Sequence, residues 1–101
     1  MDTTHEQTGF AYILTNDRRT VLYTGCTSDL AKRVYFHKRG LIPGFSKKYN
    51  VHRLVFFEQY ATMDLARKRE KSLKGKTRAK KIALIEVSNP SWNDLENQIP
   101  R

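Results

Sequence analysis

Two short apolar segments joined by a turn, near the start of the chain, constrain the fold more than any other feature of the sequence. Residues 9–15 are rich in aromatic and β-branched side chains, as strands are. Residues 16–19 (Asn-Asp-Arg-Arg) favour a turn, and residues 20–25 have the composition of a returning strand. Because so short a connection joins antiparallel strands, the sequence predicts a hairpin and an antiparallel sheet.

The remaining chain predicts a further strand and several helices. The helices are preceded by residues that cap first-turn amides and are followed by glycine or by Asn-Pro. For the first helix, Thr27 or Ser28 is the expected cap. The order β-β-α-β-α-α predicts the α+β class, with helices packed on one antiparallel sheet. We expect helices over 30–38, 63–74 and 78 to about 87, and the third strand over 51–60.

A length of 101 residues allows one domain. We expect a disordered segment over 1–8, a single domain over 9–95 and a short C-terminal tail over 96–101. Apolar runs stay far below the ~18 residues of a membrane helix, and the N-terminus lacks the pattern of a secretory signal. The single cysteine, Cys26, excludes an intrachain disulfide and a cysteine zinc finger. These features predict a cytoplasmic protein without a membrane partner.

Positive charge dominates the chain and is concentrated in one segment. There are 19 Lys and Arg against 10 Asp and Glu, a net charge of +9, and residues 67–81 hold nine of the cations. Such a balance favours polyanionic partners, nucleic acid first, although a charge run is equally typical of a solvated helix face. The candidate nucleic-acid-binding cations are Lys32, Lys47, Lys48, Arg67, Lys71, Lys74, Lys76, Lys80 and Lys81.

Charged side chains fall within the apolar stripe of the first predicted helix. Leu30, Val34 and Leu41 define the stripe that should face the sheet. Arg33 and His37 lie within the same stripe, three and seven residues after Leu30. A single histidine there is more often an ordinary surface or core residue. Ionisable groups on a buried face are costly unless they have partners, so both residues are candidates for a site.

A carboxylate occupies the corresponding stripe of the second predicted helix, where Glu70 lies among Met63, Ala66 and Leu73. An Arg–Glu pair at a helix edge is more often a structural ion pair than part of a site. Tyrosine, arginine, histidine and glutamate are, however, the groups that a metal-assisted phosphodiesterase uses. In a basic domain, this combination indicates a phosphate-processing site.

These residues resemble the motifs of the GIY-YIG nuclease superfamily. Residues 10–12 (Phe-Ala-Tyr) occupy the GIY position and residues 23–25 (Tyr-Thr-Gly) the YIG position. Arg33 and His37 match the helix Arg and the residue one turn later, and Glu70 matches the metal-ligand glutamate. The likeness is greatest to small stand-alone members related to the N-terminal nuclease domain of the excision-repair endonuclease, and it extends from about residue 9 to 95. The GIY position keeps only its tyrosine, and threonine replaces the middle residue of YIG.

The resemblance implies a three-stranded antiparallel sheet flanked by helices and one divalent metal, Mg²⁺ or Mn²⁺, held by Glu70. A water would attack a phosphodiester in line with the leaving 3′-oxygen and leave 5′-phosphate and 3′-hydroxyl ends. Tyr12 or Tyr23 would be the general base. Arg33 would stabilise transition-state charge, and His37 would contact the scissile phosphate or move a proton. Two further residues that match are Gly25, where backbone would pass close to substrate, and Asn93, a site asparagine of some members.

The expected function is a metal-dependent DNA endonuclease or nickase, with DNA repair as its expected setting. RNA and branched or damaged DNA remain open as substrates, and a targeting protein is an expected partner because no targeting domain is visible. The alternative is a non-catalytic or partner-dependent nucleic-acid-binding module of the same fold. A third reading is a basic protein-interaction domain.

Overall fold

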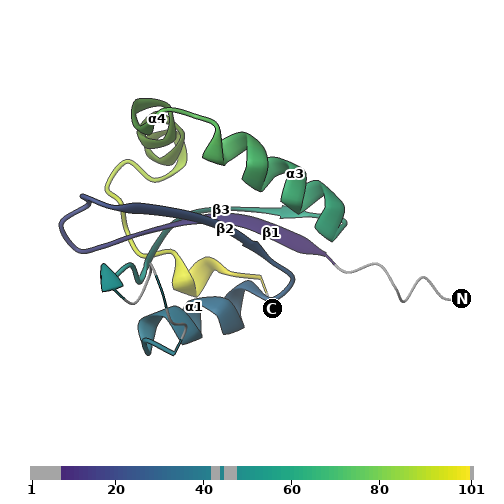
Figure 1. The fold of residues 1–101 in the computed structure, drawn as a ribbon, viewed down its shortest axis with the longest axis horizontal. Coiled ribbons are helices and arrows are strands. Elements are labelled where there is room, and N and C mark those ends of the chain that lie inside the picture. Colours follow the sequence, from purple (N-terminus) through teal and green to yellow (C-terminus); the bar gives the residue numbers. More distant parts are fainter. Residues whose placement is uncertain (1–7, 42–43, 45–47, 101) are drawn as a thin grey trace, which may run out of the picture.

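The central strand of an antiparallel sheet organises the molecule. The computed structural model describes residues 8–41, 44 and 48–100. In this part of the chain, β1 (Gly9–Thr15) lies between β2 (Leu22–Thr27) and β3 (Arg53–Tyr60), in the order β2-β1-β3 (Figure 1). Every residue of β1 is buried, as expected for a strand covered on both faces. The predicted α+β class and three-stranded sheet are confirmed.

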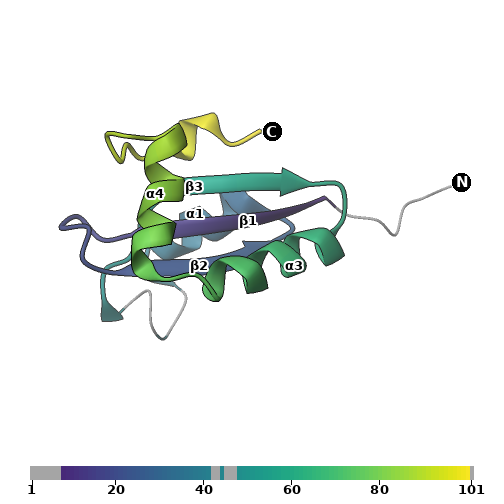
Figure 2. The ribbon, with the colours of Figure 1, turned by 90° about the horizontal axis from the view of Figure 1, so that it is seen from above.

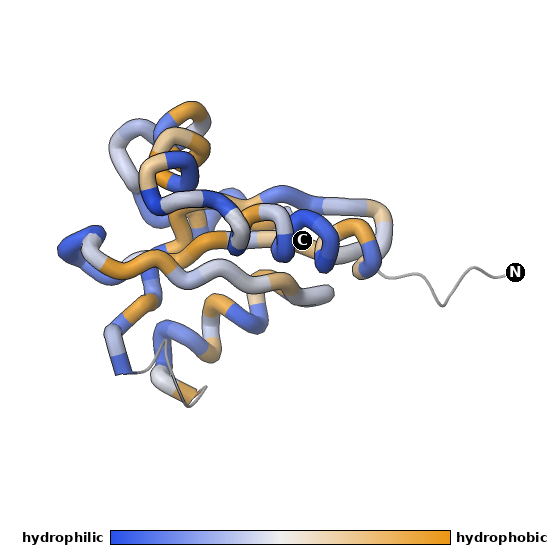
Figure 3. The backbone as a smooth tube through the Cα atoms, turned by 45° about the horizontal axis from the view of Figure 1, so that its top comes forward, coloured by the Kyte–Doolittle hydropathy of each residue, from blue (hydrophilic) through white to orange (hydrophobic). Residues whose placement is uncertain are grey.

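Helices cover both faces of the sheet. On one face lies α1 (Leu30–Lys38) together with the 3₁₀ helix η1 (Glu96–Gln98); on the other lie α3 (Met63–Lys74) and α4 (Arg78–Ser88) (Figures 1 and 2). Figure 3 shows the hydrophobic residues along the strands and the hydrophilic tip of the β1–β2 hairpin. In the described residues, no helix is long and apolar enough to cross a membrane.

Strand alternation divides the core into two clusters. Tyr12 and Leu14 of β1 pack with α1, whereas Ala11 and Ile13 pack with α3 and α4. In the antiparallel ladder Tyr12 stands opposite Gly25 of β2. Tyr12 and Gly25 therefore lie on the same face of the hairpin.

Some predicted boundaries are wrong near α1. The helix is capped by Asp29, whose carboxylate accepts a hydrogen bond from Lys32 N at 3.1 Å, and not by Thr27 or Ser28. The Thr27 hydroxyl instead accepts from Asp29 N at 3.1 Å. The helix ends at Lys38, so Leu41 lies beyond the apolar stripe and is 60% exposed.

Both later strands also begin two residues after the predicted starts. The turn after β1 is extended because the Asn16 side chain accepts hydrogen bonds from Thr20 N at 2.9 Å and Val21 N at 3.1 Å. β2 therefore starts at Leu22 and runs to Thr27, and β3 starts at Arg53. Thr62 caps α3 and Thr77 caps α4, each with its side-chain hydroxyl as the acceptor.

The end of the described chain returns to the sheet. Trp92 is buried in the core cluster beneath α3 and α4 and packs the C-terminal segment onto the core. The segment 96–101, expected as a short tail, begins with η1 and continues to Ile99, which is buried in the α1 cluster. Of the N-terminal segment 1–8, only Thr8 lies within the described residues.

The turn after α4 is organised by one buried amide. Asn89 Nδ2 donates to Val55 O at 3.1 Å and to Asn93 O at 2.9 Å, and Asn89 Oδ1 accepts from Asn93 N at 3.0 Å. The amide thus ties the C-terminal segment to β3. In these bonds Asn93 contributes only backbone atoms, and the residue is exposed.

We predict that Asn89→Ala lowers the free energy of unfolding by about 2 kcal/mol, because it leaves the buried Val55 carbonyl without this partner. Asn93→Ala keeps the backbone hydrogen bonds and should change the free energy of unfolding by less than about 0.5 kcal/mol. Urea denaturation of both variants measures the difference. Equal losses would contradict this account of the turn.

Candidate active site

Three aromatic side chains form a buried cluster between β1, β2 and α1. The ring centroids of Tyr12 and Tyr23 lie 6.4 Å apart, those of Tyr12 and His37 6.3 Å, and those of Tyr23 and His37 5.5 Å. Tyr12 and His37 are buried, and Tyr23 is half-buried. The Tyr12 hydroxyl and both His37 nitrogens have no hydrogen-bond partner in the described structure. Leaving a buried polar group unpaired costs about 1–3 kcal/mol, which favours a functional explanation.

Burial controls the protonation of this cluster. It raises the pKa of Tyr12 far above its usual value; Tyr23 adds to the effect and the Arg33 guanidinium opposes it. Burial, assisted by Arg33, lowers the pKa of His37 to about 4. At neutral pH the Tyr12 phenol is therefore protonated and the His37 imidazole is neutral.

Gly25 makes room for Tyr12. A Cβ atom at Gly25 would lie 2.6 Å from the Tyr12 hydroxyl oxygen and 2.7 Å from Cζ of the same ring. We expected this glycine to allow a close approach by substrate. The structure gives a different reason, because the phenol of the neighbouring strand fills the space where a side chain would be.

Arg33 faces an open hollow beside the cluster. The hollow has a volume of about 570 Å³ and lies between the β2–α1 connection and the first turns of α1. Arg33 is half-buried and forms no ion pair with any residue that the structure describes. Its planar guanidinium is suited to binding phosphate oxygens. The lining residues are Thr27, Ser28, Asp29, Lys32, Arg33 and Phe36.

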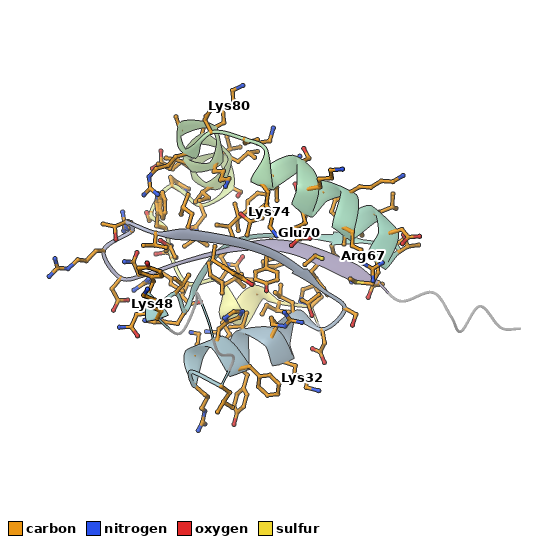
Figure 4. All side chains as sticks on the ribbon, in the orientation of Figure 1. Lys32, Lys48, Arg67, Glu70, Lys74 and Lys80 are labelled. Atoms are coloured by element: carbon orange, nitrogen blue, oxygen red, sulfur yellow. The ribbon has the colours of Figure 1, made fainter. Side chains whose placement is uncertain are left out.

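Glu70 approaches β2 from the opposite face of the sheet. Its Oε1 accepts a hydrogen bond from the Cys26 thiol at 3.2 Å, and its Oε2 pairs with Lys74 Nζ at 3.0 Å. The side chain is 22% exposed, and Figure 4 shows it beneath α3, close to Lys74. The pKa of Lys74 is raised, chiefly by this bond to Glu70.

The two halves of the site meet at the outer edge of β2. A second hollow, of about 330 Å³, is lined by Tyr23 and Thr24 of β2 and by Lys74 and Lys81 of the opposite face. Tyr23 also contributes to the raised pKa of Lys74, after Glu70, so the two groups lie within electrostatic reach. The edge strand therefore has Arg33 and His37 on one side and Glu70 and Lys74 on the other.

The donor set at Glu70 fits a hard cation that keeps most of its waters. Among the described residues there is no cluster of three or more His, Cys, Asp or Glu side chains able to hold a metal ion. Glu70 is thus a single carboxylate. Mg²⁺ accepts such a site because it binds through one or two carboxylates and completes its shell with water and substrate phosphates.

The predicted nucleic-acid-binding cations do not form one patch. Lys74 and Lys81 line the hollow at β2, and Lys32 lines the hollow beside Arg33. Lys80 points away from the sheet, at the top of Figure 4, and Arg67 pairs with Asp64 at 3.1 Å. Lys71 and Lys76 lie on or after α3, Lys48 lies over the Tyr49 ring, and Lys47 is outside the described residues.

Asn93 does not join the candidate site. It lies beside β3, in a pocket that includes Phe57 and Leu95, whereas the other residues surround β2 at the opposite edge of the sheet. Cys26 is a residue that the sequence failed to indicate, since its being the single cysteine excludes a disulfide and a zinc finger but predicts no contact with Glu70. Nothing in strand or helix periodicity relates Cys26 to a carboxylate 44 positions later.

Comparison with known proteins identifies the class of this fold and site. The sequence profile of the GIY-YIG catalytic domain matches residues 8–83. The chain therefore belongs to the GIY-YIG family, a family of nucleases that generally depend on a divalent metal. A nuclease domain of this kind implies a nucleic-acid substrate.

The similar proteins are small members of this family. The UPF0213 proteins of Staphylococcus aureus strains Mu3 and Mu50 are 42% identical over 64 residues, which cover 63% of this chain and 78% of theirs. The solution structure of the UPF0213 protein BH0048 from Bacillus halodurans has the same fold, with a TM-score of 0.56 and 24% identity. It covers 87% of this chain, and the match spans 93% of that structure.

Gly25→Ala should lower the free energy of unfolding by about 2 kcal/mol, because its Cβ would collide with the Tyr12 ring in a filled core. Gly75→Ala is the matched control, since a Cβ there would lie 3.6 Å or more from its neighbours. Its effect should stay below about 1 kcal/mol. Chemical denaturation of both variants tests this expectation. An unchanged free energy of unfolding in Gly25→Ala would refute the role assigned to Gly25.

Stability should depend on pH through His37. The unfolded imidazole takes up a proton as pH falls below about 6.5, whereas the folded one resists until about 4, so the free energy of unfolding decreases across this interval. In His37→Phe that part of the decrease should be absent. Urea denaturation at about pH 7.5 and about pH 5 measures how much free energy of unfolding the wild type and His37→Phe each lose between the two pH values. Equal losses would show that His37 is not a neutral buried group.

Proposed function

We propose that this protein is a divalent-metal-dependent DNA endonuclease that nicks one strand, with its site at the edge of β2. The observation that carries the proposal is the arrangement around this strand. Tyr23, His37 and Arg33 lie on one side, and the Glu70 carboxylate lies on the other. Membership of a nuclease family supports the same reaction class.

Tyr23 is the better candidate for the general base. Tyr12 is fully buried with a raised pKa, so its phenol keeps its proton. Tyr23 is half-buried and lines the hollow that also contains Lys74 and Lys81, so a water and a substrate phosphate in that hollow have access to it. In this proposal the Tyr23 oxygen, having given its own proton to solvent, takes a proton from the water that attacks phosphorus. The P–O bond to the leaving 3′-oxygen breaks, and that oxygen takes a proton from solvent to become the 3′-hydroxyl.

Arg33 and His37 have different tasks in the proposed reaction. Arg33 binds the non-bridging phosphate oxygens and stabilises the added negative charge of the transition state. The His37 nitrogens are buried, and its ring packs against both tyrosines. We therefore assign His37 as a positioning residue that holds the Tyr23 ring, rather than as a phosphate ligand.

Mg²⁺ or Mn²⁺, one ion per site, would be held by Glu70 and would supply positive charge next to the scissile phosphate. Glu70 Oε2 is paired with Lys74 and Oε1 accepts a hydrogen bond from Cys26, so a bound ion would compete with Lys74 for Oε2. Lys74 and Lys81 line the same hollow and would supply further positive charge there. Binding of DNA there should weaken steeply with salt, because phosphate contacts release counterions.

A second candidate function is a nucleic-acid-binding module that does not cut. The observation in its favour is that both oxygens of Glu70 already have protein partners. A domain in which these contacts persist would bind DNA through its cations without holding a metal. The two candidates differ in whether Glu70 matters for cutting.

The test is nicking of supercoiled plasmid in Mg²⁺ or Mn²⁺, with and without EDTA. Glu70→Gln should reduce nicking by at least about a hundredfold, because the amide lacks the negative charge that holds a divalent cation. Binding of the same plasmid should stay within about twofold. Glutamine keeps an acceptor for Cys26, so the fold should be unaffected.

Asp64→Asn is the matched control, since Asp64 is an exposed carboxylate on the same helix that pairs only with Arg67 among the described residues. Its nicking rate should equal that of the wild type. Nicking that survives Glu70→Gln would remove Glu70 from the site. Binding without nicking by the wild type would favour the second candidate.

A further inference from the structure

The outward face of α1 has two aromatic rings between two cations. Tyr35 is 46% exposed and Phe36 is partly exposed, and their ring centroids lie 5.9 Å apart. Lys32 Nζ lies 5.6 Å from the Phe36 ring centre, and the Arg39 guanidinium lies 4.8 Å from that of Tyr35. We call these four residues the α1 stripe. It spans the eight residues 32–39, about 10 Å along the helix axis.

The cations of the α1 stripe are available to a ligand. In the described part of the chain, neither Lys32 nor Arg39 forms an ion pair with a carboxylate. Lys38 of the same helix differs, because it is bound by both Asp94 and Glu96. A stripe that combines free positive charge with exposed aromatic rings is complementary to phosphates and bases together.

The α1 stripe begins at the candidate active site. Lys32 and Phe36 line the same hollow as Arg33, the proposed phosphate-binding residue. In Figure 4, Lys32 projects from α1 on the side of the molecule away from Glu70. A strand whose phosphate lies at Arg33 would therefore continue across α1 and reach the two rings.

The bases that stack on these rings must be unpaired. In a continuous duplex each base is covered on both faces by its neighbours, so a side chain on the protein surface has no free base face to contact. In a single strand every base offers one, and aromatic side chains stack on it whatever the base is.

We propose that the α1 stripe binds single-stranded DNA, and that the substrate of this enzyme has unpaired nucleotides next to the scissile phosphate. The stacking surface is Tyr35 and Phe36, and the flanking phosphates are bound by Lys32 and Arg39. The choice of DNA rests on the proposed endonuclease function. The binding itself requires neither metal nor cleavage, so it can be tested separately.

The test is fluorescence anisotropy, in EDTA, with a labelled single strand of about 15 nucleotides and a blunt duplex of the same length. The wild type should bind the single strand more tightly than the duplex. Tyr35→Ala should weaken single-strand binding by about fivefold or more and leave duplex binding within about twofold. Alanine is a good helix former at this exposed position, so the variant should fold.

Two controls separate stacking from loss of bulk. Tyr35→Phe keeps the ring and should bind the single strand like the wild type. Leu65→Ala removes an apolar side chain of similar exposure (45%) from α3 and should have no effect. Wild-type affinity in Tyr35→Ala, or equal affinity of the wild type for both DNAs, would overturn the proposal.

The outcomes also distinguish this proposal from the proposed function. If the protein never nicks DNA but its binding of single strands depends on Tyr35, the proposal for the α1 stripe stands and the endonuclease proposal is rejected. If nicking depends on metal and is lost in Glu70→Gln, but DNA binding does not change in Tyr35→Ala, the endonuclease proposal stands and the proposal for the α1 stripe is rejected.

Discussion

The contact of the Tyr12 phenol with the backbone of Gly25 is the constraint on which the rest of the site depends. It occurs between directly opposed residues of the central and edge strands, so it is possible only in one register. With that register fixed, Tyr23 falls on the same face as Tyr12, two residues before the glycine. α1 then packs over both rings and brings His37 and Arg33 to the edge of the sheet.

This arrangement has a cost in stability that a small domain can barely accommodate. A chain of this size has a free energy of unfolding of about 5–15 kcal/mol. Each buried polar atom that has no hydrogen-bond partner among the described residues, such as those of Tyr12, Thr24 and His37, costs about 1–3 kcal/mol. A core selected for stability alone would have apolar groups at these positions. Their presence favours a catalytic explanation, since strain and unpaired groups concentrate at functional sites.

Local patterns predicted most of the fold, because strand alternation, caps and turn residues act over a few positions. The faces of Tyr12 and Tyr23 followed from the two-residue period of a strand. Leu41 was misplaced because helical periodicity does not show where a helix ends. The Cys26–Glu70 bond could not be predicted, since it joins a strand and a helix that only the tertiary packing brings together. Similarly, the place of Asn93 near the C-terminus of the sequence does not predict which edge of the sheet it lies beside.

The two hydrophobic clusters lie on opposite faces of the sheet, and the candidate site spans both layers at β2. In the proposed reaction, a phosphodiester bound by Arg33 and by a metal ion at Glu70 would connect α1 to α3, which lie on opposite faces of the sheet. By linkage, any such ligand stabilises the folded state in proportion to the logarithm of its concentration above Kd. In this domain, bound substrate would link the helices on the two faces of the sheet. The protein without substrate should therefore be the more flexible and less stable form.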